Sequence, residues 1–225
     1  MTETTPPDAS RKGFLRMAGA GAAGSVALFV AACGGDDKAS SSSATAAATA
    51  TPTAADMRSD LEILNYALTL EYLEADFYAQ VIDSGLAKGD IAELAKAIGQ
   101  SEQDHVDALT KTITSLGGKP VSAPKTKFEP VLAKGLDVVL QTAATVENLG
   151  AAAYLGQAPR IKNKDVLAAA LSIHTVEARH AAGLNMLVGR GFTGKNGLEG
   201  SIPDGAFGSP MDMDAVLAAV KPYIA

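Results

Sequence analysis

A repeated pattern of glutamate, tyrosine and histidine constrains the fold of this chain more than any other feature. One part of the pattern is a Glu followed seven residues later by a Tyr, and the other is a Glu followed three residues later by a His. Each part occurs twice, in the order Glu71–Tyr78, Glu102–His105, Glu147–Tyr154 and Glu177–His180. Because the copies return in the same order with similar apolar neighbours, the sequence predicts two related helical hairpins in one domain.

Apolar residues at steps of three and four predict one long helix around each motif. The predicted helices run over about 59–83, 90–117, 131–156 and 166–189. Ser59 and Asp90 are suitable N-cap residues, and Gly85 and Gly117 are suitable stops. No alternating strand pattern competes with these periods, so the predicted fold class is all-α.

The lengths of the connections predict how the helices are arranged. The first and last connections are short, which favours two antiparallel hairpins. The middle connection, of about 14 residues, can span about 45 Å, whereas a helix of about 27 residues is about 40 Å long. The chain is therefore predicted to form an antiparallel four-helix bundle with a long crossover between the second and third helices. A Gly-rich loop and a short C-terminal helix, from Met211 or Asp212 to Lys221, are expected within residues 191–225.

Glutamates and histidines in this pattern are suited to holding metal ions. Residues three apart share a helical face, and every motif falls near the middle of its helix, so all of them are expected at one level of the bundle. Buried carboxylates without cations would repel one another or bind protons, whereas two divalent cations neutralise four carboxylates. Oxygen-rich ligation with two imidazoles favours iron or manganese over tetrahedral zinc. The predicted metal ligands are Glu71, Glu102, His105, Glu147, Glu177 and His180.

Four further residues are candidates for supporting roles beside the metals. Glu74, one turn after the first lone glutamate, is either an additional ligand or a rim charge, and the repeat places Gly150 at its counterpart. His174, one turn before the last glutamate, is either a supporting group or extra ligand, or an ordinary half-buried histidine. Tyr78 and Tyr154 either donate hydrogen bonds to ligand carboxylates across the bundle or serve as core aromatics.

The first 33 residues have the pattern of an export signal. A basic run at residues 11–16 precedes an apolar stretch at residues 18–32, which is short for a membrane span. The stretch leads into Cys33, the only cysteine of the chain, and this ending resembles a lipoprotein box whose cysteine is lipidated. The basic run resembles a twin-arginine signal, except that Lys12 stands where the second arginine is usual. A plain signal peptide or an uncleaved anchor is the alternative.

Composition assigns the rest of the N-terminal region and limits the partners. Residues 34–56 are rich in Gly, Ser, Ala and Thr and predict a disordered tether, so the folded bundle is assigned to residues 57–190. The net charge of −6 opposes nucleic acid as a partner. One cysteine excludes an internal disulfide and a thiolate metal cluster. The expected location is the extracytoplasmic side of the cell membrane, through a lipid anchor.

The motifs together resemble the ferritin-like domain family. The resemblance rests on the segment Leu-Thr-Leu-Glu-Tyr-Leu-Glu-Ala-Asp-Phe-Tyr at residues 68–78, on both Glu-x-x-His motifs and on Glu147. The family is related to ferritins, rubrerythrins and manganese catalases and includes desiccation-related members. The resemblance covers about residues 57–189 and implies that the family's metal-binding carboxylates and imidazoles fall on the six predicted ligands.

This resemblance and the ligand set lead to a functional expectation. Two adjacent metals in such a bundle can cycle redox state with peroxide or oxygen. We therefore expect an extracytoplasmic dimetal carboxylate protein that acts on peroxide, oxygen or ferrous iron. A metal-binding or structural stress protein without turnover is the alternative. The choice of iron or manganese, the electron donor and the formation of a homo-oligomer stay open.

Overall fold

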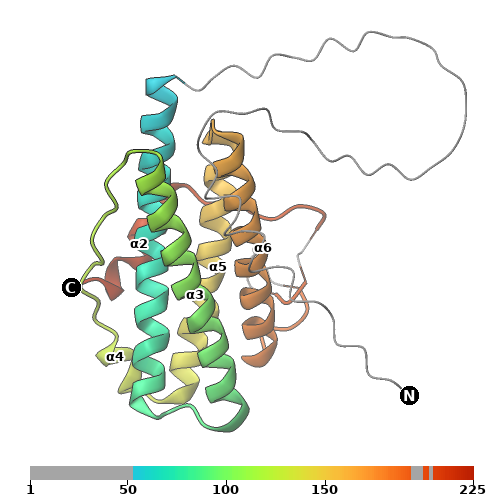
Figure 1. Cartoon of the computed structure of the whole chain (residues 1–225). Helices are drawn as coiled ribbons and strands as arrows, with labels where there is room; N and C mark the ends of the chain where they lie inside the picture. The colour runs from blue at the N-terminus through green and yellow to red at the C-terminus, as the bar shows by residue number, and fades with distance from the viewer. Residues whose placement is uncertain (1–52, 194–199, 203–204) are drawn as a thin grey trace, which may run out of the picture. The chain divides into compact units, whose positions relative to one another are not determined.

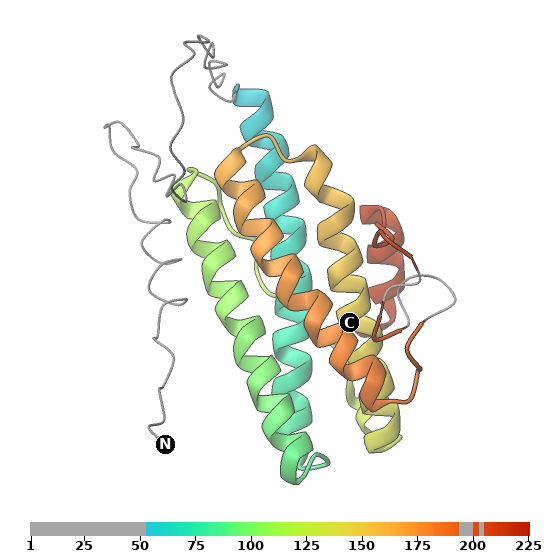
Figure 2. The ribbon, with the colours of Figure 1, turned by 90° about the vertical axis from the view of Figure 1, so that its right-hand side faces the viewer.

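The computed structural model describes residues 53–193, 200–202 and 205–225 (Figure 1). The predicted export signal, with Cys33, and nearly all of the predicted tether lie outside the described residues. Within them, four long helices lie side by side (Figures 1 and 2). These helices are α2 (Ala54–Ser84), α3 (Gly89–Ser115), α5 (Leu136–Gln157) and α6 (Lys164–Leu187). The prediction of an all-α four-helix bundle is confirmed.

Helix α2 begins earlier than its apolar periodicity indicates. The prediction that Ser59 caps this helix is wrong, because Thr53 and Asp56 form a capping box one and a half turns upstream. The Asp56 amide donates to Thr53 Oγ1 at 3.2 Å, and the Thr53 amide donates to Asp56 Oδ2 at 2.9 Å. The helix ends at Gly85, the predicted stop, whose φ of 64° suits a residue without a side chain.

The third predicted helix is divided in two. A single turn, α4 (Glu129–Leu132), precedes α5, and Gly135 with a φ of 90° separates them. Pro130 is accommodated because it stands in the first turn of α4, where its missing N–H costs nothing. The N-cap prediction for Asp90 is also wrong, because α3 begins at Gly89 and Lys88 occupies the cap position.

The predicted long crossover connects α3 to α4 along the outside of the bundle (Figure 1). Hydrogen bonds hold it against α2 at two points along that helix. The Val121 amide donates to Asn65 Oδ1 at 2.8 Å, and the Thr126 hydroxyl donates to the Asp76 carboxylate. At its lower end the ring of Phe128 is fully buried and packs edge-on against Phe77. The crossover therefore returns the chain to the end of the bundle at which α5 must begin.

The C-terminal segment packs on the bundle and on the crossover. Helix α7 (Met213–Val220) follows the N-cap Asp212 and lies beside α5, where it buries Val216 and Val220 (Figure 2). The final residues pair with the crossover, because the Ala225 amide donates to the Lys125 carbonyl at 2.8 Å. The short C-terminal helix predicted from Met211 or Asp212 is thus present.

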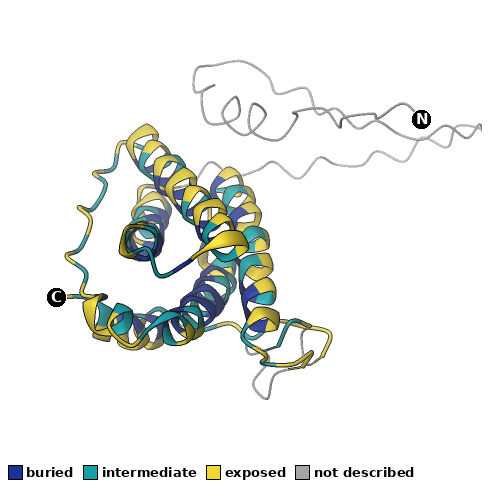
Figure 3. Ribbon diagram, turned by 90° about the horizontal axis from the view of Figure 1, so that it is seen from below, coloured by how far each residue is buried: buried dark blue, intermediate teal, exposed yellow. Residues whose placement is uncertain are grey.

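Two apolar clusters fill the bundle, one towards each end. Their burial pattern is visible as the dark inner faces of the helices in Figure 3. One cluster contains Phe77 and Val139, and the other contains Leu68 and Ile113. The four motif glutamates lie between these clusters along their helices, so apolar side chains exclude water on both sides of them. Among the described helices, none is both long enough and apolar enough to cross a membrane.

Candidate metal centre

The bundle brings the six predicted ligands together in its interior. Each glutamate comes from a different long helix, and none of the four has measurable exposure to solvent. The two histidines stand one turn after the glutamates of α3 and α6, on the same helical faces. The cluster consists of Glu71 from α2, Glu102 and His105 from α3, Glu147 from α5, and Glu177 and His180 from α6.

The imidazole nitrogens stand at the centre of the carboxylate oxygens. His105 Nδ1 lies 2.9 Å from Glu102 Oε2, 3.1 Å from Glu71 Oε2 and 3.1 Å from Glu177 Oε1. His180 Nδ1 lies 2.9 Å from Glu102 Oε1 and 3.1 Å from Glu147 Oε2. Donor atoms from three helices thus converge on each of two neighbouring points.

These donors form two overlapping groups that have the composition of a dimetal site. Glu71, Glu102, His105 and Glu177 form one group, and Glu102, Glu147, Glu177 and His180 form the other. Within each group the ligand atoms all lie within 4.8 Å of one another. The glutamates of α3 and α6 belong to both groups and are therefore placed to bridge two ions, a distinction that sequence spacing does not make. Glu71 and His105 belong only to the first group, and Glu147 and His180 belong only to the second. Each of these pairs therefore marks one end of the centre.

The hydrogen bonding of the cluster fits cations better than protons alone. Among the described residues, Glu102 Oε1 and both carboxylate oxygens of Glu177 are buried and receive no well-aligned hydrogen bond. Glu102 Oε1 and Glu177 Oε1 are approached by histidine Nδ1 atoms at 2.9 and 3.1 Å, and Glu177 Oε2 has no contact of either kind within that part of the chain. His105 Nδ1 has three carboxylate oxygens within 3.1 Å, yet one N–H can be directed at only one of them. A buried oxygen without a partner is costly. A cation at each convergence point would satisfy these oxygens, so the residues fit two divalent ions.

Burial dominates the ionisation of the carboxylates. It raises the pKa of Glu71 to about 7, although the neighbouring His105 opposes the shift. Burial also raises the pKa of Glu147, and raises that of Glu177 well above its usual range with help from the surrounding carboxylates. Glu102 differs: burial favours its neutral form, but contacts with two histidines outweigh burial and lower its pKa to about 2. Without metal, the cluster must therefore retain protons at neutral pH.

The pKa values of the two histidines are raised by the carboxylates around them, in spite of burial. Burial would lower the pKa of His180, but Glu102 and Glu147 overcome it and raise that pKa to about 9. The pKa of His105 is likewise raised far above its usual value, because three carboxylates outweigh its burial. Since a metal-bound imidazole nitrogen must be free of its proton, metal binding and proton release are linked in this cluster.

Two tyrosines connect the halves of the repeat crosswise. The hydroxyl of Tyr78 on α2 donates to Glu147 Oε1 on α5 at 2.6 Å, and that of Tyr154 on α5 donates to Glu71 Oε1 on α2 at 2.5 Å. Each tyrosine thus orients the end glutamate of the other half, and leaves the second oxygen of that carboxylate for the metal. Of the two roles considered from the sequence, the geometry matches the hydrogen-bonding one.

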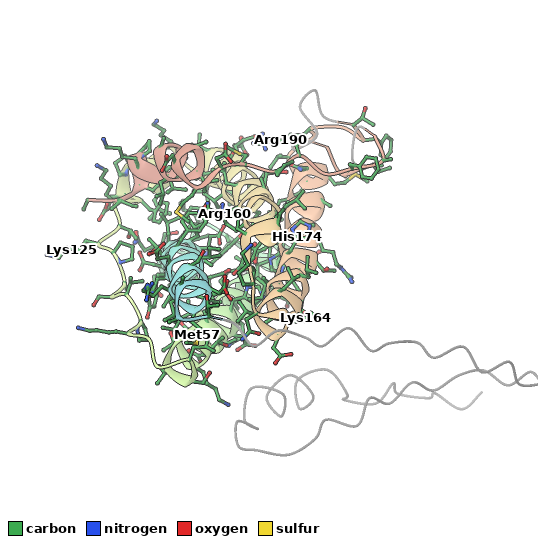
Figure 4. All side chains as sticks on the ribbon, turned by 90° about the horizontal axis from the view of Figure 1, so that it is seen from above. Met57, Lys125, Arg160, Lys164, His174 and Arg190 are labelled. Atoms are coloured by element: carbon green, nitrogen blue, oxygen red, sulfur yellow. The ribbon has the colours of Figure 1, made fainter. Side chains whose placement is uncertain are left out.

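The other two candidates lie in different surroundings. His174 on α6 (Figure 4) directs Nδ1 to the Ala151 carbonyl at 3.0 Å and belongs to neither donor group. Its side chain ties α6 to α5 and does not reach the cluster. Glu74 is 2% exposed and belongs to neither group as well, but burial and four neighbouring carboxylates raise its pKa well above the usual range.

Two residues near the cluster were not predicted as functional. Gly150 lies beside the carboxylates of Glu74 and Glu177, and its signal in the sequence is the missing side chain at the repeat position of Glu74. The hydroxyl of Tyr66 is buried without a hydrogen-bond partner in the described part of the chain, and burial together with Glu74 raises its pKa. Nothing in the spacing of Tyr66 distinguishes it from a core aromatic.

Comparisons with known proteins agree with the fold. A family model described as "Ferritin-like domain" matches residues 59–190. The crystal structure of ferritin like, diiron-carboxylate proteins from Bacillus anthracis str. Ames is similar to this chain, with a TM-score of 0.50 and 21% sequence identity over 60% of this chain and 99% of that one. At that identity the likeness concerns the fold alone. No curated protein matches the chain.

Proposed function

The chain belongs to the ferritin-like domain family, and from that premise we propose that it is a dimetal carboxylate protein that binds two iron or manganese ions. We further propose that the loaded centre reacts with peroxide or oxygen, or oxidises ferrous iron. The observation that carries this proposal is the pair of overlapping donor groups that share Glu102 and Glu177. A structural bundle would gain nothing from four fully buried glutamates, since burying unpaired charge is strongly unfavourable.

The residues of the chain prepare this centre in three ways. Glu102 and Glu177 belong to both donor groups and would hold both ions. Tyr78 and Tyr154 hold the end glutamates by one oxygen each. The apolar clusters on both sides keep water away and so strengthen every electrostatic interaction between them. A pair of iron or manganese ions held there would supply one electron each for the reduction of peroxide, which takes up two electrons and two protons to give two water molecules.

The site of action forms part of the proposal. The basic and apolar segments before Cys33 support export and a lipid anchor, which would place the bundle on the extracytoplasmic face of the cell membrane. The composition of residues 34–56 supports a tether between anchor and bundle. Metabolic labelling of full-length protein with a fatty acid, compared with a Cys33→Ser variant, tests this part. Unlabelled wild-type protein in the exporting host would contradict it.

The metal site is tested by counting ions in the purified full chain. After expression with ample iron or manganese, about two ions per chain are expected by mass spectrometry of the metals. Glu102→Ala and His180→Ala should each lose at least one ion, because they remove a bridging and an end ligand. Glu93→Ala changes an exposed glutamate on the same helix as Glu102 and is the matched control. Less than about one ion per wild-type chain would refute the site.

Turnover is tested separately from binding. The reduced, metal-loaded protein is mixed with peroxide, and both the loss of peroxide and the visible absorbance are followed. Peroxide loss and a new absorption band that are both absent in Glu102→Ala would support redox chemistry. Stoichiometric metal with neither change, with peroxide or with oxygen, would favour a metal-binding protein without turnover. With a single cysteine the chain builds no thiolate cluster of its own, so any electrons that turnover requires would come from a separate donor.

A further inference from the structure

In the described part of the chain, a fifth buried glutamate lies beside the cluster and has no hydrogen-bond or ion-pair partner. Glu74 on α2 is 2% exposed, and it makes no hydrogen bond or ion pair with any described residue. It stands one turn after Glu71, on nearly the same helical face. A glutamate is rarely so buried unless it is paired or bound to a cation. The fold therefore carries one carboxylate more than the repeat requires.

The space around Glu74 is provided by the opposite half of the repeat. A Cβ atom built on Gly150 of α5 would lie 3.1 Å from Glu74 Oε1 and 3.1 Å from Glu177 Oε2. Both oxygens therefore approach the same point, where any residue other than glycine would crowd them. Glu74 and Gly150 occupy equivalent positions of the two repeats, so one half supplies a carboxylate and the other supplies the gap that receives it.

The side chain of Glu74 points towards one end of the cluster. Glu74 extends from α2 towards α5 and α6, the helices that carry Glu147 and His180. Gly150 stands one turn after Glu147 on α5, and Glu177 stands one turn before His180 on α6. Both observations place the carboxylate of Glu74 nearer to the Glu147–His180 end than to the Glu71–His105 end.

We propose that Glu74 is a ligand of the metal ion held by Glu147 and His180, so that the two metal positions of this centre are unequal. The inference rests on the proposed dimetal function. Without Glu74, each position has the same donors, namely one end glutamate, one histidine and the two shared glutamates. An added carboxylate at one position gives that ion more negative charge and one more oxygen, which favours tighter binding and a higher oxidation state there.

The test is a titration of the metal-free full chain with Mn²⁺, followed by the paramagnetic resonance signal of the free ion. The wild type is expected to bind two ions with different affinities. Glu74→Gln should weaken one position by about tenfold or more and leave the other within about threefold. Glu62→Gln removes one negative charge from an exposed position of the same helix and should match the wild type. Circular dichroism before each titration checks that the variant is folded.

A second variant separates ligation from the effect of charge. Glu74→Asp keeps the charge but withdraws the carboxylate by one methylene, so ligation predicts weakening at one position, whereas a field effect predicts wild-type affinities. Two double variants identify the metal position that Glu74 serves. Glu74→Gln should still weaken binding in His105→Gln, which retains the Glu147–His180 position, and should add little in His180→Gln, where that position is already impaired.

The outcomes distinguish this inference from the proposed function. Two ions in the wild type with affinities unchanged in Glu74→Gln would overturn the role of Glu74 alone. Equal weakening of both positions, or wild-type behaviour of Glu74→Asp, would overturn it in the same way. A wild type that binds neither Mn²⁺ nor, without oxygen, Fe²⁺ would instead refute the dimetal function itself.

Discussion

The metal-free bundle is expected to lose stability as the pH rises through the range in which His180 gives up its proton. In the folded chain without metal, Glu102 and Glu147 raise the pKa of His180 from 6.5 to about 9. The folded state therefore holds this proton more tightly than the unfolded state does. The resulting stabilisation is complete below pH 6.5 and is lost as the pH rises towards 9. Glu71, with a pKa raised to about 7, adds a loss that begins at lower pH.

The size of the effect follows from the shift. A difference of one pKa unit corresponds to about 1.4 kcal/mol, so His180 contributes about 3 kcal/mol that disappears between pH 6.5 and pH 9. For a domain of this size, such a change moves the melting temperature by about 10 °C. With saturating Mn²⁺ the sign changes, because a metal-bound imidazole cannot take a proton in the folded state. The loaded protein should then gain stability up to about pH 6.5 and keep it to pH 9.

The measurement is urea unfolding of the full chain at pH 5, 6.5, 8 and 9, followed by circular dichroism, with a chelator or with excess Mn²⁺. His180→Gln should reduce the loss between pH 6.5 and pH 9 by about 3 kcal/mol in the chelator series. His174→Gln removes the histidine that faces the Ala151 carbonyl and should keep the wild-type pH profile. Both substitutions remove one histidine from α6, so they are matched in chemistry and differ in location.

Three results would refute this reasoning. Metal-free stability that is constant or rising between pH 6.5 and pH 9 would mean that the carboxylates do not hold a proton on His180. A loss of equal size in His180→Gln would assign the pH dependence to other groups. The same parallel fall with and without Mn²⁺ would show that metal and protons do not compete for this cluster.

Two further predictions concern single hydrogen bonds. Tyr154→Phe removes the 2.5 Å bond to Glu71 and should weaken Mn²⁺ binding at the Glu71 end by about tenfold or more, and an unchanged titration would contradict the orienting role of the hydroxyl. Asp60→Ala removes a buried carboxylate that accepts the amides of Lys162 and Asn163 at 2.8 and 2.7 Å, and should cost about 3 kcal/mol in urea unfolding without changing metal content. A cost below about 1 kcal/mol would mean that the loop before α6 finds other partners.

The repeat made the bundle and its ligand set predictable because both depend on local spacing. A residue three positions after Glu102 or Glu177 must share its helical face, whatever the helix packs against. The crossover was predictable for a related reason, since chain length limits how its ends can be joined. Helix limits were less accurate, because Thr53 adds a capping box where the apolar pattern has not yet begun, and Gly135 interrupts a pattern that continues on both sides of it.

Features that depend on the approach of distant side chains were not predictable from spacing. The sequence places Tyr78 two turns from Glu71 on nearly the same helical face, but only the packed structure shows that its hydroxyl reaches Glu147 on another helix. His174 has the spacing of a ligand, yet it faces the backbone of α5. The opposite holds for Glu74, whose burial depends on the absence of a side chain at Gly150.

The crosswise tyrosines have a consequence for the ancestry of the fold. Because Tyr78 serves the glutamate of the second hairpin and Tyr154 serves that of the first, neither hairpin contains all the groups that orient its own end of the centre. A gene that encoded a single hairpin could build this arrangement only as a symmetric pair of chains. Because one chain encodes both halves, each half can change by itself, and the pairing of Glu74 with a glycine at the equivalent position 150 is a difference that two identical chains could never encode.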